Sequence, residues 1–237
     1  MEEQQVSAKL RRGERTESGI IILYEDNHLL VVEKPVNLPV QTDSSGDEDL
    51  LTRLKAYLRA RYDKPGEAYL GLVHRLDRPV GGVMAFAKTS KAAARLTAQF
   101  GAREAKKRYA AIVSGRPRAQ ESLTDWLCKD EVTFSSRVAP QGTDGAKEAR
   151  MRYALLAQAE ETALLDVELY TGRPHQIRVQ LAHAGYPIYG DQRYAKDTPA
   201  GEQIRLWAYA LTLTHPTLKE PMTFFSAPPW GERVFAA

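Results

Sequence analysis

Apolar residues follow two different spacings along the chain, and each spacing predicts its own kind of element. Residues 20–24 and 29–32 are short apolar runs separated by a polar link, which is typical of a β-hairpin. Residues 50–58 instead repeat leucine and tyrosine at helical intervals, and Ser45 and Glu48 precede them in the pattern of a capping box. We therefore expect helices and strands to be mixed from the start of the chain.

The same spacings continue to the C-terminus. A second helix begins at Thr89 or Ser90 and ends at Gly101, and a third follows Pro174 over roughly residues 175–184. Residues 121–145 are polar and interrupted by glycine, so we expect a loop there. Further strands are predicted over residues 83–87, 109–114, 150–156, 163–170, 206–213 and 222–225.

Composition is that of an ordinary globular protein. The chain has 237 residues, of which 43% are hydrophobic and 27% charged, with a net charge of +3. We expect a flexible arm over residues 1–18 and one domain over residues 19–237. The single cysteine, Cys128, excludes an internal disulfide, and neither a signal peptide nor a run long enough to cross a membrane is recognised. A cytoplasmic protein with no membrane partner is expected.

One carboxylate lies between two guanidiniums in the stretch GLVHRLDRPVGG, residues 71–82. Asp77 is flanked by Arg75 and Arg78, and His74 lies just upstream. Nearby positive charge favours the ionised carboxylate, which suits a nucleophile or an electrostatic stabiliser better than a general acid. From the charge pattern alone, however, a surface loop with a local ion pair is the favoured interpretation, because such pairs are common.

A basic segment follows. It carries nine lysines and arginines against one acid, Glu104. Because the rest of the chain is near neutral, this local excess of positive charge favours a surface that binds a polyanion over one that is only solvated. The nine are Lys88, Lys91, Arg95, Arg103, Lys106, Lys107, Arg108, Arg116 and Arg118.

Arg178 lies at the edge of the apolar stripe of the third helix. Ile177, Leu181 and Ala184 form that stripe. A guanidinium beside a buried face needs a carboxylate partner, and we nominate Asp77. The alternative is that Arg178 extends to solvent, which helical spacing does not exclude.

Several chemistries lack their motifs. None of the five histidines forms the i,i+4 pair of a helical zinc site, and no cysteine pair exists, so no metal site is predicted. Neither a phosphate-binding glycine loop nor a G-x-S-x-G turn occurs. What remains is an ionised aspartate, a tyrosine, a partner arginine and a basic surface. That set could attack an electrophilic carbon in a nucleic acid without a cofactor, if the base leaves its stack.

Three blocks of sequence carry a family resemblance. HRLDRPVGGVMAFAKTSKAAARLTAQF, KKRYAAIVSG and LYTGRPHQIRVQLAHAGYPIYGD follow one another in this order. Together they resemble the RluA-type pseudouridine synthases. The opening ILYEDNHLLVVEKPVNLPVQ and the closing LWAYALTLTHP also resemble that family, so the likeness covers about residues 20–228.

The resemblance implies an α+β fold, the pseudouridine synthase catalytic fold, with a long mixed but mainly antiparallel sheet flanked by helices and loops. It implies isomerisation of uridine to pseudouridine in structured RNA, either tRNA or rRNA, with no cofactor and no metal. Asp77 would attack the base or the sugar, Tyr109 would stack on the base and assist proton removal, and Arg178 would partner the aspartate. Possible RNA contacts are His74, Arg75, Arg78, Lys106, Lys107, Arg108, Arg173, His175 and Gln176. His74 fits a structural role equally well.

Two positions depart from the family pattern. Pro79-Val80-Gly81-Gly82 replaces a turn that usually resembles Thr-Ser-Gly, and Trp207 occupies a position where many relatives have histidine. Both changes bear on substrate preference more than on activity. No small RNA-binding domain precedes the catalytic domain in this sequence, so we expect the catalytic domain itself to recognise RNA, as a monomer.

The sequence leaves two other functions open. One is an RNA-binding or RNA-folding factor that keeps the scaffold with weak catalysis, against which the presence of Asp77, Tyr109 and Arg178 argues. The other, more distant, is a metal-dependent nuclease.

Overall fold

The computed structural model describes residues 13–63, 65–130, 132–196 and 198–231. The chain divides into two compact units, each formed by segments that are distant in sequence. Of the described residues, unit 1 contains those within Met1–Arg78, Gly82–Ala105 and Thr212–Ser226, and unit 2 contains those within Pro79–Gly81, Lys106–Leu211 and Ala227–Ala237. The single domain predicted over residues 19–237 stays a prediction.

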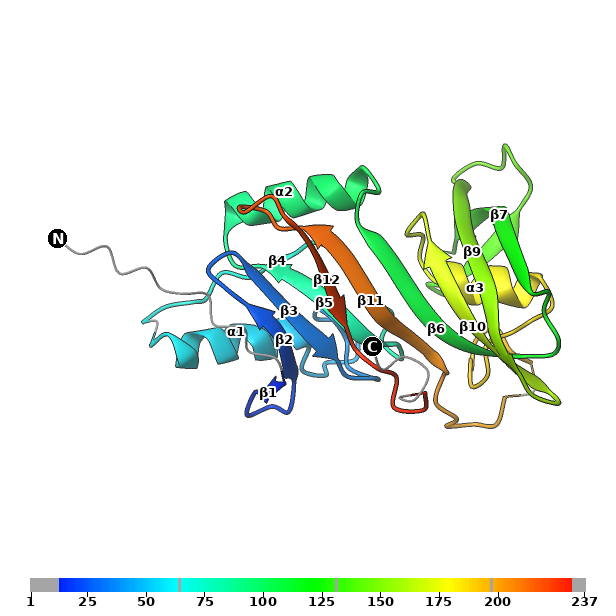
Figure 1. Ribbon diagram of the computed structural model, residues 1–237, viewed down its shortest axis with the longest axis horizontal. Helices are drawn as coiled ribbons and strands as arrows, with labels where there is room; N and C mark the ends of the chain where they lie inside the picture. Colours follow the sequence, from blue (N-terminus) through cyan, green and yellow to red (C-terminus); the bar gives the residue numbers. More distant parts are fainter. Residues whose placement is uncertain (1–12, 64, 131, 197, 232–237) are drawn as a thin grey trace. The chain divides into compact units, whose positions relative to one another are not determined.

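The strands of unit 1 pair in an antiparallel manner. The predicted hairpin is confirmed, because β2 (Ile21–Glu25) pairs with β3 (Leu29–Lys34), which ends one residue before a proline. β3 in turn pairs with β5 (Gly81–Ala87), and Figure 1 shows β1, β2 and β3 in blue. The other strands here are β1 (Glu14–Arg15) on β2, β4 (Gly71–Leu72) on β5, and β12 (Pro221–Phe225), which contacts β2.

Two helices complete unit 1. The side chain of Asp49 caps α1 (Leu50–Arg61) by accepting from the backbone N–H three residues further on. The predicted capping box is therefore wrong, and Ser45 instead bonds within the loop before the helix. Thr89 caps α2 (Ser90–Gly101), which settles the alternative that the sequence left open.

Unit 2 is built on an antiparallel sheet whose strands follow the order β6-β10-β9-β7-β8. The predicted loop over residues 121–145 is wrong, because it contains most of β7 and all of β8. Polar and exposed residues alternate along β7, so it lacks the apolar run that identifies a buried strand. The bounds are β6 (Lys106–Ser114), β7 (Gln120–Lys129), β8 (Ser136–Ala139), β9 (Lys147–Gln158) and β10 (Thr162–Leu169). β11 (Leu206–Thr214) has residues 206–211 in unit 2 and residues 212–214 in unit 1.

The helix of unit 2 is short and mostly buried. α3 (Gln176–His183) packs against β7 and β8, and its first six residues are buried. The helix begins and ends within one residue of the predicted range, 175–184. His175, which precedes it, has a φ of 54°, so the chain turns sharply into the helix.

The α+β class and the mainly antiparallel pairing agree with the prediction. Residues 1–12 of the predicted arm lie outside the described residues, and Glu14–Arg15 within it form β1. No helix in the described part of the chain is long and apolar enough to cross a membrane.

Candidate active site

Asp77 lies in an irregular loop between β4 and β5, and its residue is half-buried. The buried side chains of Leu76 and Val80 anchor the loop on either side of it. Apolar anchors of this kind restrict the loop, so the carboxylate is presented from a supported backbone rather than from a free surface turn.

His74 supports the same loop. Its Nε2 accepts a hydrogen bond of 3.0 Å from the backbone N–H of Ala85 in β5, and its ring stacks on Phe100 at a centroid distance of 4.5 Å. The imidazole thereby continues the β4–β5 pairing beyond the last paired backbone residue. These contacts give His74 the structural role that the sequence left open beside RNA binding.

Lys34, at the end of β3, is a charged group near Asp77 that no sequence motif indicated. Its side chain is buried, and Nζ donates to the carbonyl oxygens of Pro35 at 2.8 Å and Arg78 at 3.0 Å. Burial lowers the pKa of Lys34 to about 7, while the charge of Asp77 opposes that fall and the charge of Arg78 adds to it. In the sequence, only the position of this lysine indicated burial, because it ends an apolar run directly before a proline.

The two arginines flanking Asp77 are exposed. Arg78 pairs with two carboxylates of the loop before α1, Asp43 at 3.6 Å and Asp47. These ion pairs join Arg78 to that loop, whereas the local pair with Asp77 that the charge pattern favoured stays a prediction.

Tyr109 lies on β6 in unit 2 and is buried, opposite Val167 of β10. Ala111 and Val113, at alternate positions further along the strand, are buried too.

The three basic residues that begin β6 differ in their surroundings. Lys106 is exposed and Lys107 is half-buried. Arg108 forms an ion pair with Asp166 on β10, with Nε 3.2 Å from Oδ1, and the hydroxyl of Tyr209 donates to the same carboxylate at 2.8 Å. The charge of Arg108 is therefore already balanced inside unit 2, whereas Lys106 offers its charge to solvent.

Arg178 on α3 is buried, and it does have the carboxylate partner that a buried guanidinium needs. Its Nε and Nη2 donate to the two oxygens of Asp191, each at 2.8 Å. Burial alone would raise the pKa of Asp191, but the bonds from Arg178 and from the backbone of Arg193 and Tyr194 hold it below the usual value. Asp191 was not among the residues that the sequence singled out.

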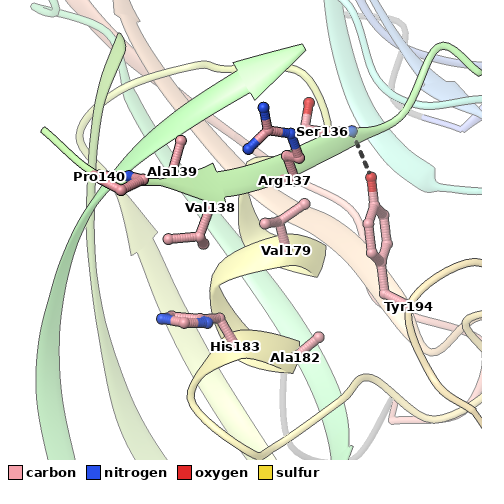
Figure 2. A pocket seen from close by; sticks show the side chains of 9 residues that line it. All are labelled: Ser136, Arg137, Val138, Ala139, Pro140, Val179, Ala182, His183 and Tyr194. Carbon is pink, nitrogen blue, oxygen red and sulfur yellow. Dashed lines mark hydrogen bonds between the residues drawn. The ribbon is translucent and has the colours of Figure 1, made fainter. Parts of the chain in front are cut away.

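Tyr194 links this ion pair to neighbouring residues. The guanidinium carbon of Arg178 lies 5.2 Å from the ring centre of Tyr194, whose hydroxyl is 2.8 Å from Nδ1 of His175. The same hydroxyl accepts from the backbone N–H of Ser136 at 2.8 Å, the bond drawn in Figure 2. His175 thus contacts the group that covers Arg178.

Gln176 lies inside the fold. Its Oε1 accepts from the Thr171 hydroxyl at 2.7 Å and from the Arg173 backbone at 3.0 Å, while Nε2 donates to Arg150 and Gln180. The side chain holds the turn that leads into α3, so its influence on the site passes through its neighbours.

A pocket of about 580 Å³ opens between β8 and α3. Val138, Val179 and Ala182 supply apolar surface, with Arg137 and His183 also in its lining, as Figure 2 shows. None of the candidate catalytic residues lines it. Among the described residues, no three His, Cys, Asp or Glu side chains are grouped so that they could hold one metal ion.

The predicted catalytic set is distributed over both units. Asp77 belongs to unit 1, together with Lys34 and His74, whereas Tyr109 and Arg178 belong to unit 2. The pairing of Arg178 with Asp77 stays a prediction.

Comparison with known proteins decides the family. The family model for RNA pseudouridylate synthase matches residues 28–183, a segment that contains Asp77, Tyr109 and Arg178. The chain belongs to this family. It is 33% identical to the ribosomal large subunit pseudouridine synthase C of Vibrio vulnificus, over 90% of this chain and 67% of that protein. It is also 33% identical to the dual-specificity RNA pseudouridine synthase RluA of Escherichia coli, over 88% of this chain and 93% of that protein.

Solved structures agree on the fold. The human RNA pseudouridylate synthase domain containing 4 superposes with a TM-score of 0.74 at 24% identity, over 91% of this chain and 90% of that one. The predicted family, fold class and isomerase activity on RNA uridine are therefore confirmed.

Proposed function

We propose that this pseudouridine synthase uses Asp77 as its nucleophile, with Arg178 as the partner of the carboxylate and Tyr109 as the residue that stacks on the base. The bond from C1′ of the ribose to N1 of uracil breaks, a bond from C1′ to C5 forms, and the proton of C5 is lost while N1 gains one. Atoms and electrons therefore balance without an oxidant or reductant. Attack of Asp77 on the base and attack on the sugar both satisfy this scheme.

The observation that carries the proposal is the support around Asp77. Leu76 and Val80 are buried beside it, and the Lys34 ammonium bonds the carbonyl of the next residue. A nucleophile needs a fixed position relative to the reacting carbon, and a supported loop provides one. The sequence match of the family model to this segment adds to that support.

We propose tRNA or rRNA as the substrate. One relative is named for the ribosomal large subunit and another for dual specificity toward RNA, so rRNA and tRNA are the first substrates to test. Lys106 and Lys107 are proposed phosphate contacts, together with Arg75. A monomeric state and a cytoplasmic location stay predictions.

The test is release of tritium from RNA that carries [5-³H]uridine. Asp77→Asn should bind RNA but release no tritium, because the amide cannot act as the nucleophile. The matched control is Asp63→Asn, since Asp63 is exposed and its φ of 45° is one that asparagine tolerates. Undiminished release by Asp77→Asn would overturn the mechanism. Wild-type binding with no turnover on any cellular RNA would instead favour a non-catalytic RNA-binding factor.

A further inference from the structure

A second carboxylate controls the orientation of Arg178. Asp191 is 1% exposed, and its two oxygens accept from Nε and Nη2, so the pair is bidentate along one edge of the guanidinium. The same carboxylate accepts from the backbone of Arg193 at 3.0 Å and Tyr194 at 3.3 Å. Four bonds thus hold Asp191, and the turn over residues 191–194 holds it in place.

The geometry fixes the plane of the guanidinium as well as its position. A bidentate bond is planar, and the ring of Tyr194 lies 5.2 Å from the guanidinium carbon. Tyr194 itself is held by Ser136 and His175. An arginine side chain ordinarily samples many rotamers, so these contacts leave Arg178 far less freedom than an unsupported arginine has.

From this arrangement we propose that Asp191 is a positioning residue for the pseudouridine synthase reaction. By taking the Nε–Nη2 edge, it directs the other edge of Arg178 away from itself, where a second carboxylate can meet it. The inference rests on the proposed function, in which that second carboxylate is Asp77. A purely structural role, in which the pair only fastens α3 to the turn over residues 191–194, is the alternative to be tested.

The experiment measures single-turnover conversion of bound RNA and, separately, RNA affinity. Asp191→Asn keeps the shape of the side chain but places an NH₂ group opposite an N–H of Arg178. We expect conversion to slow by about 10²-fold, the cost typical of misplacing a reacting group by about 1 Å, with RNA affinity unchanged. The matched control is Asp125→Asn, because Asp125 also anchors α3, through Gln180 at 2.7 Å, without contacting Arg178. The control should keep the wild-type rate.

A double-mutant cycle separates positioning from structure. If Asp191 acts through Arg178, adding Asp191→Asn to Arg178→Gln should slow conversion no further than Arg178→Gln alone. If Asp191→Asn does not fold, Asp191→Glu keeps the charge, and a slowed rate with unchanged affinity is expected from the displaced guanidinium. A wild-type rate for a folded Asp191 variant, or fully additive losses in the cycle, would overturn the inference. An active Asp77→Asn would overturn the proposed function instead, so the two failures are distinguishable.

Discussion

Lys34 should make the stability of the fold depend on pH in a window where most side chains do not titrate. The ammonium is buried at the end of β3, and burial lowers its pKa from 10.5 to about 7. At about 1.4 kcal/mol per pH unit, a fall of that size means that holding the charge inside the fold costs about 5 kcal/mol. The bonds to Pro35 and Arg78 are present, and yet the desolvation dominates.

The sign follows from proton binding. Below pH 7, Lys34 is protonated in both states and the cost is constant. Between pH 7 and 10.5 the unfolded chain binds a proton that the folded chain does not, so the free energy of unfolding rises with pH. From pH 7 to 9 the rise is about 2 kcal/mol. Above pH 10 Tyr24 acts in the opposite direction, because its folded pKa is raised to about 12.

Urea unfolding at several pH values from 6 to 9 measures this effect. The quantity to compare is the difference in the free energy of unfolding between wild type and Lys34→Met, since other groups contribute equally to both proteins. The difference should change by about 2 kcal/mol from pH 7 to 9, with Lys34→Met lacking the rise. Lys91→Met, which removes an exposed lysine from α2 in the same unit, should follow the wild-type curve. If Lys34→Met and wild type have parallel pH curves, the buried ammonium does not titrate near 7 and the reasoning is refuted.

Two further predictions concern packing and RNA binding. Gly81→Ala should destabilise the protein by about 1–3 kcal/mol in thermal or urea unfolding, because a methyl group there would overlap the ring of Trp207. In a Trp207→His background, Gly81→Ala should cost much less stability than it does in the wild type. An equal cost in both backgrounds would contradict the contact. Lys106→Gln with Lys107→Gln should weaken RNA binding for all sequences and reduce the slope of log K against log salt by about 1 to 2. An unchanged slope would mean that the RNA follows another surface.

The elements of the fold that alternate or repeat apolar residues could be predicted from the sequence. The hairpin of β2 and β3, the helix α2 and the strand β10 all have such patterns. β7 could not be, because charged and polar residues occupy its exposed positions and its buried residues come only near its end. A strand of this kind is recognised by its neighbours in the sheet, which the local sequence does not contain.

The motifs identified Asp77, Tyr109 and Arg178, but the groups that hold them were harder to find. Helical spacing showed that Arg178 needed a carboxylate, yet the partner found in unit 2, Asp191, lies in a turn with no periodicity of its own. Lys34 had only the weak clue of its place before a proline. Which charge meets which depends on tertiary packing, and spacing along one element carries little of that information.

The two departures from the family pattern turn out to be one contact. Gly81 belongs to the Pro79-Val80-Gly81-Gly82 turn, and the ring of Trp207 fills the space that a side chain on Gly81 would need. Neither position explains the other in the linear sequence. In the fold, the absence of a side chain at Gly81 leaves room for the ring of Trp207.

Two charged residues of the proposed catalytic set, Asp77 and Arg178, each have a neighbour of opposite charge within their own unit. In unit 1 the positive charge of Lys34 opposes the negative charge of Asp77, and in unit 2 Asp191 binds Arg178. A buried charge without such a neighbour would tend to neutralise or to leave the interior. With Asp191 as its neighbour, Arg178 can be oriented before RNA binds, so less reorganisation is needed in the chemical step. The Lys34 and Asp191 variants test the two halves of this argument independently.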